Sequence, residues 1–154
     1  MKPNCFVIGY ERTGTTLLYN ILSNSDKISL PFRKEPHYFD YNIKKGEKWY
    51  LNYFSDLKKE IICDITPNYI NVNNIANIIL EYNKKSSVII IIRNPIKLIE
   101  SMYLHDIKTL KTEDSFEKFW NKNKNKVLFY EKLKSFGSIF KKEKLLICVF
   151  EENI

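Results

Sequence analysis

The chain has 154 residues and a formal net charge of +7, and 44% of its residues are hydrophobic, which suits one globular domain with a core of its own. No apolar run approaches the roughly 20 residues of a membrane-spanning helix, and the three cysteines lack the spacing of a disulfide framework or a zinc site. The positive charge suits an anionic ligand, but the lysines are scattered and form no stripe for nucleic acid.

The chain begins with an apolar strand at residues 5–9, a turn rich in Gly and Thr, and a helix at residues 15–23. Strands that are apolar throughout are typical of parallel sheets covered on both faces. At such a strand–turn–helix junction the backbone N–H groups converge on one point, and the helix dipole adds positive charge there. The sequence therefore predicts a phosphate-binding loop at this junction.

This loop has the glycine spacing of a Walker A loop without its lysine. Gly9 and Gly14 match Gly-x-x-x-x-Gly-Lys-[Ser/Thr], but Thr15 stands at the lysine position. The nearest cation in the sequence is Arg12, inside the loop. We therefore expect a phosphate ligand other than the β- and γ-phosphates of ATP.

Beyond residues 30–40, where Pro31 and Pro36 exclude a regular helix, strands and helices alternate. Strands are predicted at residues 61–65, 87–92 and 145–150. Helices are predicted at residues 45–53, 72–82, 95–104 and beyond, 116–122 and 126–141, with a surface turn at residues 121–126. This order predicts an α/β fold in three layers, P-loop-like, with a central and mainly parallel sheet flanked by helices.

The cysteines and the N-terminus bear on the compartment. Cys5, Cys63 and Cys148 each lie within an apolar strand-like run, so we expect buried, reduced thiols. The N-terminus has no apolar segment of the kind found in a signal peptide. Together these features predict a soluble, cytoplasmic protein.

Four patches of sequence carry a resemblance to a known family. They are Arg-Thr-Gly-Thr-Thr at 12–16, Lys-Glu-Pro-His-Tyr-Phe-Asp at 34–40 with Gly46 and Trp49-Tyr50 after it, Asp-Ile-Thr-Pro-Asn-Tyr at 64–69, and Ile-Arg-Asn-Pro at 92–95 with Ser101 after it. Each patch is weak by itself. In this order and spacing they resemble the sulfotransferases that use 3′-phosphoadenosine 5′-phosphosulfate (PAPS), most closely the branch that includes the heparan sulfate sulfotransferases.

The resemblance implies an enzyme that transfers a sulfuryl group from its co-substrate PAPS to a hydroxyl or amine acceptor, with a glycan as the expected acceptor and without a metal ion. It places the 5′-phosphosulfate on the loop of Arg12, Thr13, Gly14, Thr15 and Thr16. Backbone N–H groups of residues 13–16 would form the cradle, with the hydroxyls of Thr15 and Thr16 as extra donors. Arg12 would stabilise the leaving phosphate through charge-assisted hydrogen bonds.

The remaining roles fall on two other segments. Arg93, at the carboxyl end of a strand, and Ser101, about two helical turns after Pro95, are expected to bind the 3′-phosphate. Glu35 is the expected general base, favoured by an aromatic setting from Phe32, Tyr38 and Phe39. His37 and Asp40 would assist it or bind substrate, and Lys34 would contact donor or acceptor. His105 is expected to be structural.

Two departures and two alternatives accompany the resemblance. Ile65 stands where that branch has a basic residue, and the chain ends at Ile154 where the family continues. The expected single sulfotransferase-like domain, residues 1–154, would therefore be incomplete at its C-terminus. One alternative is a P-loop kinase or NTPase with Asp64 near a magnesium ion, and the other is a nucleotide-binding remnant without turnover.

Overall fold

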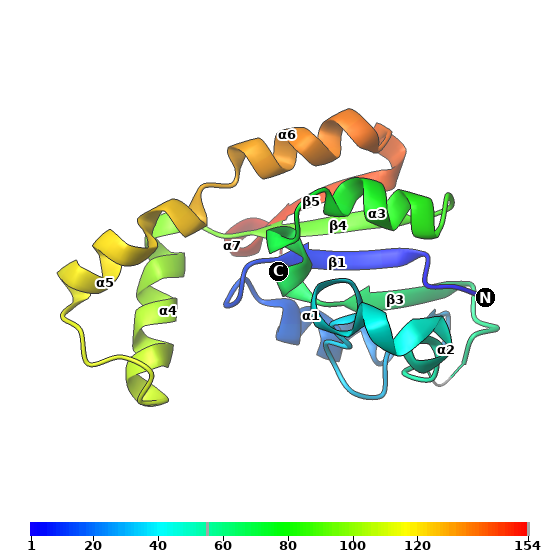
Figure 1. Ribbon diagram of the computed structural model, residues 1–154, viewed down its shortest axis with the longest axis horizontal. Helices are drawn as coiled ribbons and strands as arrows, with labels where there is room; N and C mark the ends of the chain where they lie inside the picture. The colour runs from blue at the N-terminus through cyan, green and yellow to red at the C-terminus, as the bar shows by residue number, and fades with distance from the viewer. Residues whose placement is uncertain (55, 154) are drawn as a thin grey trace.

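The computed structural model describes residues 1–54 and 56–153 and contains a five-stranded sheet. The strands lie in the order β2-β3-β1-β4-β5, and each neighbouring pair is parallel (Figure 1). They are β1 (Cys5–Gly9), β2 (Ile28–Ser29), β3 (Ile61–Ile65), β4 (Ser87–Ile92) and β5 (Leu145–Val149). The predicted α/β class with a central parallel sheet is confirmed.

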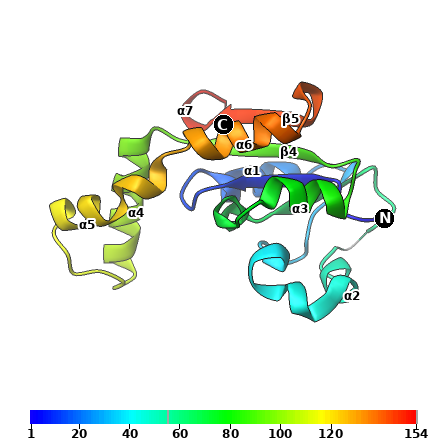
Figure 2. The same cartoon turned by 45° about the horizontal axis from the view of Figure 1, so that its top comes forward.

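The helices lie on both faces of this sheet and beyond its carboxyl edge (Figures 1 and 2). Within the described residues they are α1 (Thr15–Leu22), α2 (Gly46–Leu51), α3 (Ile75–Tyr82), α4 (Pro95–Lys108), α5 (Phe116–Asn123), α6 (Tyr130–Ile139) and α7 (Phe150–Asn153). Of the helices in residues 1–54 and 56–153, none combines the length and apolarity needed to cross a bilayer.

Alternation along the strands produces two separate apolar clusters, one on each face of the sheet. Phe6 and Ile8 of β1 point into the larger cluster, which also takes residues of α2, α3 and α6. Val7 points to the opposite face and packs with residues of α1, such as Leu18, and with Phe150 of α7. The central strands β1 and β4 are almost entirely apolar because both of their faces are covered, as the sequence predicted.

The start of α4 is defined by its own residues. Pro95 occupies the first turn, and the Asn94 side chain accepts hydrogen bonds from the N–H groups of Ile96 (3.0 Å) and Lys97 (3.3 Å). The helix continues to Lys108, and together with α5 it lies beyond the carboxyl end of β4 (Figures 1 and 2). This arrangement brings α4 next to the loop between β1 and α1.

Several predicted boundaries were wrong for local reasons. The two-residue strand β2 is too short to leave an alternation in the sequence. Helix α3 begins at Ile75, because Asn74 before it has a left-handed φ of 58°. Residues 121–123 belong to α5 instead of a surface turn, and the buried Asn123 side chain donates to the Phe119 carbonyl at 2.8 Å.

The cysteines only partly follow the prediction. Cys63 is buried on β3, but Cys5 and Cys148 are partly exposed. Cys5 is the first residue of β1, at the end of that strand. Cys148 lies on β5, the last strand of the sheet, which is incompletely covered.

The two glycines Gly14 and Gly137 provide a matched test of the loop. Gly14 has φ +93°, and an added Cβ would lie 2.3 Å from the Phe150 ring, whereas a Cβ at Gly137 in α6 meets nothing within 4 Å. We expect Gly14→Ala to lower the free energy of unfolding by about 2 kcal/mol or more. Gly137→Ala should raise it by about 0.5–1 kcal/mol, since alanine favours a helix interior. Urea unfolding measures both changes, and equal effects would contradict the close packing of Phe150 on the loop.

Candidate active site

The loop between β1 and α1 leaves the first N–H groups of the helix free for a ligand. Arg12 and Gly14 have left-handed φ values of 69° and 93°, and the first helical bond runs from the Leu18 N–H to the Gly14 carbonyl. Gly14 is the N-cap of α1 and brings no side chain to cap the helix. Donors at such a helix start, with the helix dipole behind them, form a site for an anion.

The Thr13 hydroxyl and N–H are both directed to the backbone of the loop itself. Its hydroxyl donates to the Tyr10 carbonyl at 2.7 Å, and its N–H points to the same oxygen at 3.4 Å. The side chain is fully buried. Thr13 therefore closes the loop through its hydroxyl, and the contribution of its N–H to a phosphate cradle stays a prediction.

Lys34 supplies a cation over this loop. Its ammonium group donates to the Thr15 hydroxyl at 3.2 Å and to the Thr16 hydroxyl at 2.8 Å. The loop thus has a lysine in space where the Walker pattern lacks one in sequence, and it arrives from the segment before the π-helical turn at Tyr38–Asn42. The sequence had indicated only that Lys34 contacts the sulfuryl donor or the acceptor substrate.

The structure brings Glu35, His37 and Asp40 into one chain of contacts. Glu35 Oε1 lies 2.9 Å from Lys34 Nζ, and Glu35 Oε2 lies 3.5 Å from His37 Nε2. His37 Nδ1 lies 2.8 Å from Asp40 Oδ2. Because a carboxylate only accepts, His37 must carry its hydrogen on Nδ1 for this bond, which leaves Nε2 facing Glu35.

The backbone around these residues is strained. Glu35 and His37 both have left-handed φ values, 62° and 52°, which are unusual for residues with a side chain. Such strain persists only where neighbouring contacts hold it, and it is common at functional sites. The aromatic setting expected for Glu35 is absent. Phe32 is 71% exposed, while Tyr38 and Phe39 turn into the core.

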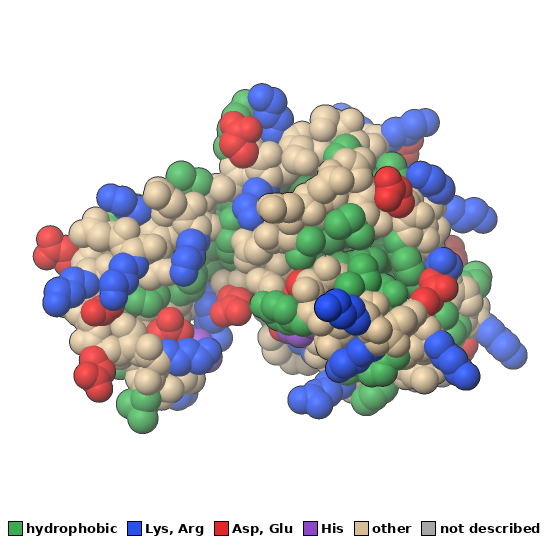
Figure 3. Space-filling view, viewed as in Figure 1, with side chains coloured by type: hydrophobic (Ala, Val, Ile, Leu, Met, Phe, Trp, Pro, Cys, Tyr) green, Lys and Arg blue, Asp and Glu red, His purple; other side chains and the backbone are tan. Residues whose placement is uncertain are grey.

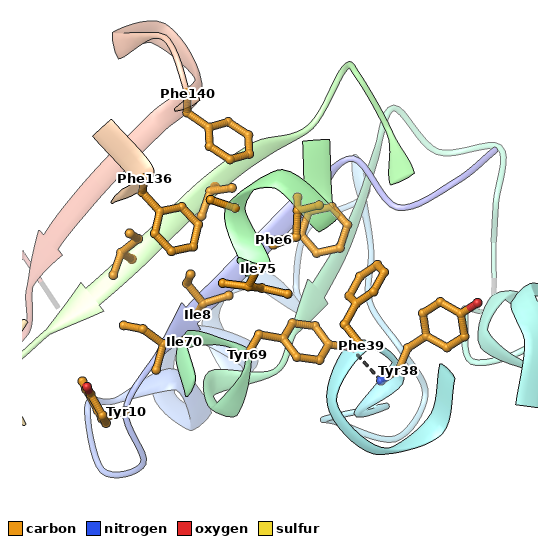
Figure 4. Packing of buried hydrophobic residues seen from close by; sticks show 14 of the residues in the cluster. Phe6, Ile8, Tyr10, Tyr38, Phe39, Tyr69, Ile70, Ile75, Phe136 and Phe140 are labelled. Carbon is orange, nitrogen blue, oxygen red and sulfur yellow. Dashed lines mark hydrogen bonds between the residues drawn. The ribbon is translucent and has the colours of Figure 1, made fainter. Parts of the chain in front are cut away.

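A buried carboxyl group holds this segment in place. Asp64, at the end of β3, accepts hydrogen bonds from the hydroxyls of Tyr50, Thr66 (2.6 Å) and Tyr69 (3.0 Å). The Tyr69 hydroxyl also accepts from the Tyr38 N–H at 2.8 Å, the bond drawn in Figure 4. Asp64 thereby connects the sheet to the backbone next to His37.

Burial raises the pKa of Asp64 from its ordinary 3.8 to about 6, although the three hydroxyl donors act in the opposite direction. Asp64 is fully buried and both of its carboxyl oxygens accept hydrogen bonds from these hydroxyls, which does not resemble the exposed carboxylate of a magnesium site. In the described part of the chain, no cluster of His, Cys, Asp and Glu could hold a metal ion.

Arg93 and Ser101 meet Arg12 at the carboxyl edge of the sheet, as their predicted placement required. The Arg12 Nε donates to Ser101 Oγ at 3.3 Å, and Arg93 Nη1 donates to the Arg12 carbonyl at 2.8 Å. These residues line a cleft of about 660 Å³ along α4. The other lining residues are Lys97, Glu100, Leu104, His105, Lys108 and Thr109. Basic side chains predominate in this cleft, in contrast to the mixed charges spread over the face in Figure 3.

Two residues at or beside this cleft, His105 and Glu151, were not assigned to it from the sequence. His105 was expected to be structural, yet it lines the cleft. Glu151 of α7 lies 3.4 Å from Arg93 Nε and accepts from the Asn94 N–H at 3.2 Å, and the Arg93 guanidinium lies over the Phe150 ring at 4.9 Å. The only signal for Glu151 is its place directly after a strand, since nothing local pairs it with Arg93.

The arrangement resembles known proteins in sequence and in fold. A family model described as "Sulfotransferase domain" matches residues 2–153. The membrane-associated sulfotransferase kil1 of Dictyostelium discoideum is 32% identical over 117 residues, covering 73% of this chain and 25% of that protein. Heparan sulfate glucosamine 3-O-sulfotransferase 3B1 of Mus musculus is 27% identical over 124 residues, covering 80% of this chain and 32% of that protein. The chain thus spans a quarter to a third of the length of these relatives.

Solved structures show the same fold. A sulfotransferase from Alicyclobacillus acidocaldarius superimposes with a TM-score of 0.86 at 21% identity, covering 99% of this chain and 74% of that one. A mouse sulfotransferase complexed with PAP superimposes with a TM-score of 0.60 at 18% identity, covering 95% and 51%. The carboxyl edge of such sheets is where open α/β folds bind ligands.

The pKa of Asp64 leads to a pH-dependent stability. Because its folded-state pKa is raised, the stabilising contribution of this group is present below pH 3.8 and is lost as the pH rises through about 6. We expect the unfolding free energy of the wild type, minus that of Asp64→Asn, to fall by roughly 2–3 kcal/mol between pH 4 and pH 7. Urea unfolding across this range measures the difference. A difference that does not change with pH would contradict the burial of an ionisable group here.

Proposed function

This chain belongs to the sulfotransferase family, and we propose that it transfers a sulfuryl group from PAPS to a carbohydrate hydroxyl or amine. The observation that carries the proposal is the meeting of two anion-binding groups at one edge of the sheet. One consists of the free N–H groups at the start of α1 with Lys34, and the other of Arg12, Arg93 and Ser101. A nucleotide with phosphate groups on both the 3′ and the 5′ oxygen of its ribose fits this arrangement.

The two groups have different tasks in this proposal. The loop and Lys34 hold the 5′-phosphate, and Arg93 and Ser101 hold the 3′-phosphate and thereby fix the position of the nucleotide. Arg12 lies between them, since its backbone belongs to the loop and its side chain reaches Ser101. A guanidinium group is a cationic hydrogen-bond donor and not a proton acceptor, so the contribution of Arg12 is electrostatic.

Proton transfer falls to Glu35 in this proposal. As the acceptor oxygen forms its bond to sulfur, the bond from sulfur to the bridging phosphate oxygen breaks, and that oxygen keeps the electron pair. Glu35 takes the hydroxyl proton, while Arg12 and Lys34 stabilise the charge that develops on the phosphate. His37, held between Glu35 and Asp40, fixes the carboxylate in position.

A carbohydrate acceptor is supported by the relatives, which include a heparan sulfate glucosamine 3-O-sulfotransferase. The kinase or NTPase alternative is less well supported, because Asp64 is buried under three hydroxyl donors and Thr15 replaces the Walker lysine. The two candidate functions predict different ligands. If the chain is a sulfotransferase, adenosine 3′,5′-bisphosphate should raise its melting temperature, and Mg·ATP should not. The reverse result would contradict the proposal.

Removal of the proposed base should abolish turnover and leave nucleotide binding intact. We expect Glu35→Gln to lower kcat by about 10²- to 10⁴-fold in an assay of labelled sulfate transfer from PAPS, with an unchanged Kd for adenosine 3′,5′-bisphosphate. Glu60→Gln, at an exposed position in a turn, is the control and should keep full activity. If Glu35→Gln keeps kcat and His37→Asn loses it, the base is His37.

Removal of the cation proposed to hold the 3′-phosphate should weaken the binding of the nucleotide. We expect Arg93→Met to raise the Kd for adenosine 3′,5′-bisphosphate by about 10- to 100-fold, because a charge-assisted hydrogen bond to the phosphate is lost. Arg33→Met removes the same charge from an exposed position and should change the Kd by less than about twofold. Calorimetric titration measures both values. Equal losses in the two variants would indicate general charge attraction instead of a site.

A further inference from the structure

A second hollow lies beside the cleft, and no role has been assigned to it so far. It has a volume of about 310 Å³ and is lined by Tyr10, Glu11, Asn68, Asn71, Met102 and Lys126. These residues come from the phosphate loop, the 3-10 turn at Pro67–Asn71, helix α4 and the segment after α5. The volume is at the low end for ligand pockets and suits one small ring.

The hollow and the basic cleft are separated by a shared wall. Arg12 and Ser101 line the cleft, and their chain neighbours Glu11 and Met102 line the hollow. The hydrogen bond from Arg12 Nε to Ser101 Oγ joins the two segments that form this wall. A group that leaves a nucleotide in the cleft beside Arg12 is therefore next to the hollow.

The hollow is also connected to the proposed proton acceptor. Asn68 donates to Asp40 Oδ2 at 2.8 Å, and Asp40 holds His37 beside Glu35. Asn71 donates in turn to Asn68 Oδ1 at 3.0 Å. The amide wall of the hollow thus continues directly into the contact chain of Glu35.

The lining has no net charge. Glu11 and Lys126 are exposed, and among the described residues neither has an ion-pair or hydrogen-bond partner. Tyr10 and Met102 supply apolar surface, and the Tyr10 ring packs edge-on against Phe129 at 5.2 Å. Apolar surface with a few charged groups at its rim suits the face and hydroxyls of a sugar, whereas Glu11 would repel a sulfate or carboxylate bound next to it.

We propose that this hollow binds the acceptor as an uncharged sugar ring, with Glu11 and Lys126 hydrogen-bonded to its hydroxyls. The proposal rests on the sulfuryl-transfer function and makes it more specific. A neutral unit at the reacting position distinguishes this chain from an enzyme that takes a sulfated unit there. The acceptor hydroxyl would enter from the hollow, and the nucleotide would lie in the cleft on the other side of Arg12.

Met102 allows a test that does not depend on turnover, because the chain has only two methionines, Met1 and Met102. The protein is labelled with ¹³C-methyl methionine, saturated with adenosine 3′,5′-bisphosphate and titrated with N,N′-diacetylchitobiose (chitobiose below), a neutral disaccharide. We expect the Met102 methyl resonance, assigned with Met102→Leu, to shift saturably while that of Met1 stays in place. Glu11→Gln and Lys126→Met should each weaken this titration about tenfold.

Matched controls and a charged competitor complete the experiment. Glu113→Gln and Lys124→Met carry the same changes at exposed positions that do not line the hollow, and they should titrate like the wild type. An N-sulfated heparan hexasaccharide should shift Met102 only at higher concentration than chitobiose. The proposal is overturned if Met102 does not respond to chitobiose, if the hexasaccharide binds more tightly, or if the controls lose affinity equally. If the wild-type protein binds chitobiose as expected but transfers no sulfate from PAPS, the result would instead contradict the proposed function.

Discussion

A buried carboxyl group, Asp64, holds together the part of the molecule on which the candidate site depends. Removing a carboxylate from water is unfavourable unless donors replace the water, and here three hydroxyls do so. One of them, from Tyr69, also accepts the backbone N–H of Tyr38. The strained segment that carries Glu35 and His37 is therefore connected to the central sheet through Tyr69 and Asp64, and such contacts hold its left-handed backbone in place.

The half of the candidate site proposed to bind phosphate has a comparable support on the opposite face. Phe150 of α7 packs so closely on Gly14 that no side chain fits there, and the same ring lies under the Arg93 guanidinium. Glu151 then binds Arg93 and the start of α4. One short helix after the last strand thus supports both the loop and the second cation. Positioning of this kind matters in sulfuryl transfer, because catalysis there consists mainly of orientation and charge stabilisation.

Much of the fold could be predicted because each element carried its own signal. The strands at residues 5–9, 61–65 and 87–92 were found with their observed bounds, since continuous apolar runs between turn residues identify buried parallel strands. The start of α4 was found from Pro95. The two-residue strand β2 and the start of α3 were missed, because the first is too short for a pattern and the second depends on the backbone of Asn74. The placement of Arg93 at the carboxyl edge of the sheet followed from its position at the end of a strand, whereas its contact with the Arg12 carbonyl and the Arg12–Ser101 hydrogen bond are seen only in the structure.

The sequence by itself determined the α/β class, the phosphate loop with threonine in place of lysine, and the family. Only the tertiary structure decided which side chains face one another there. It placed Lys34 over the hydroxyls of the loop and brought Glu151 to Arg93. The physical reason is that a hydrogen bond or ion pair forms between atoms a few ångströms apart in space, and residues separated by tens of positions along the chain leave no periodic trace of such a contact.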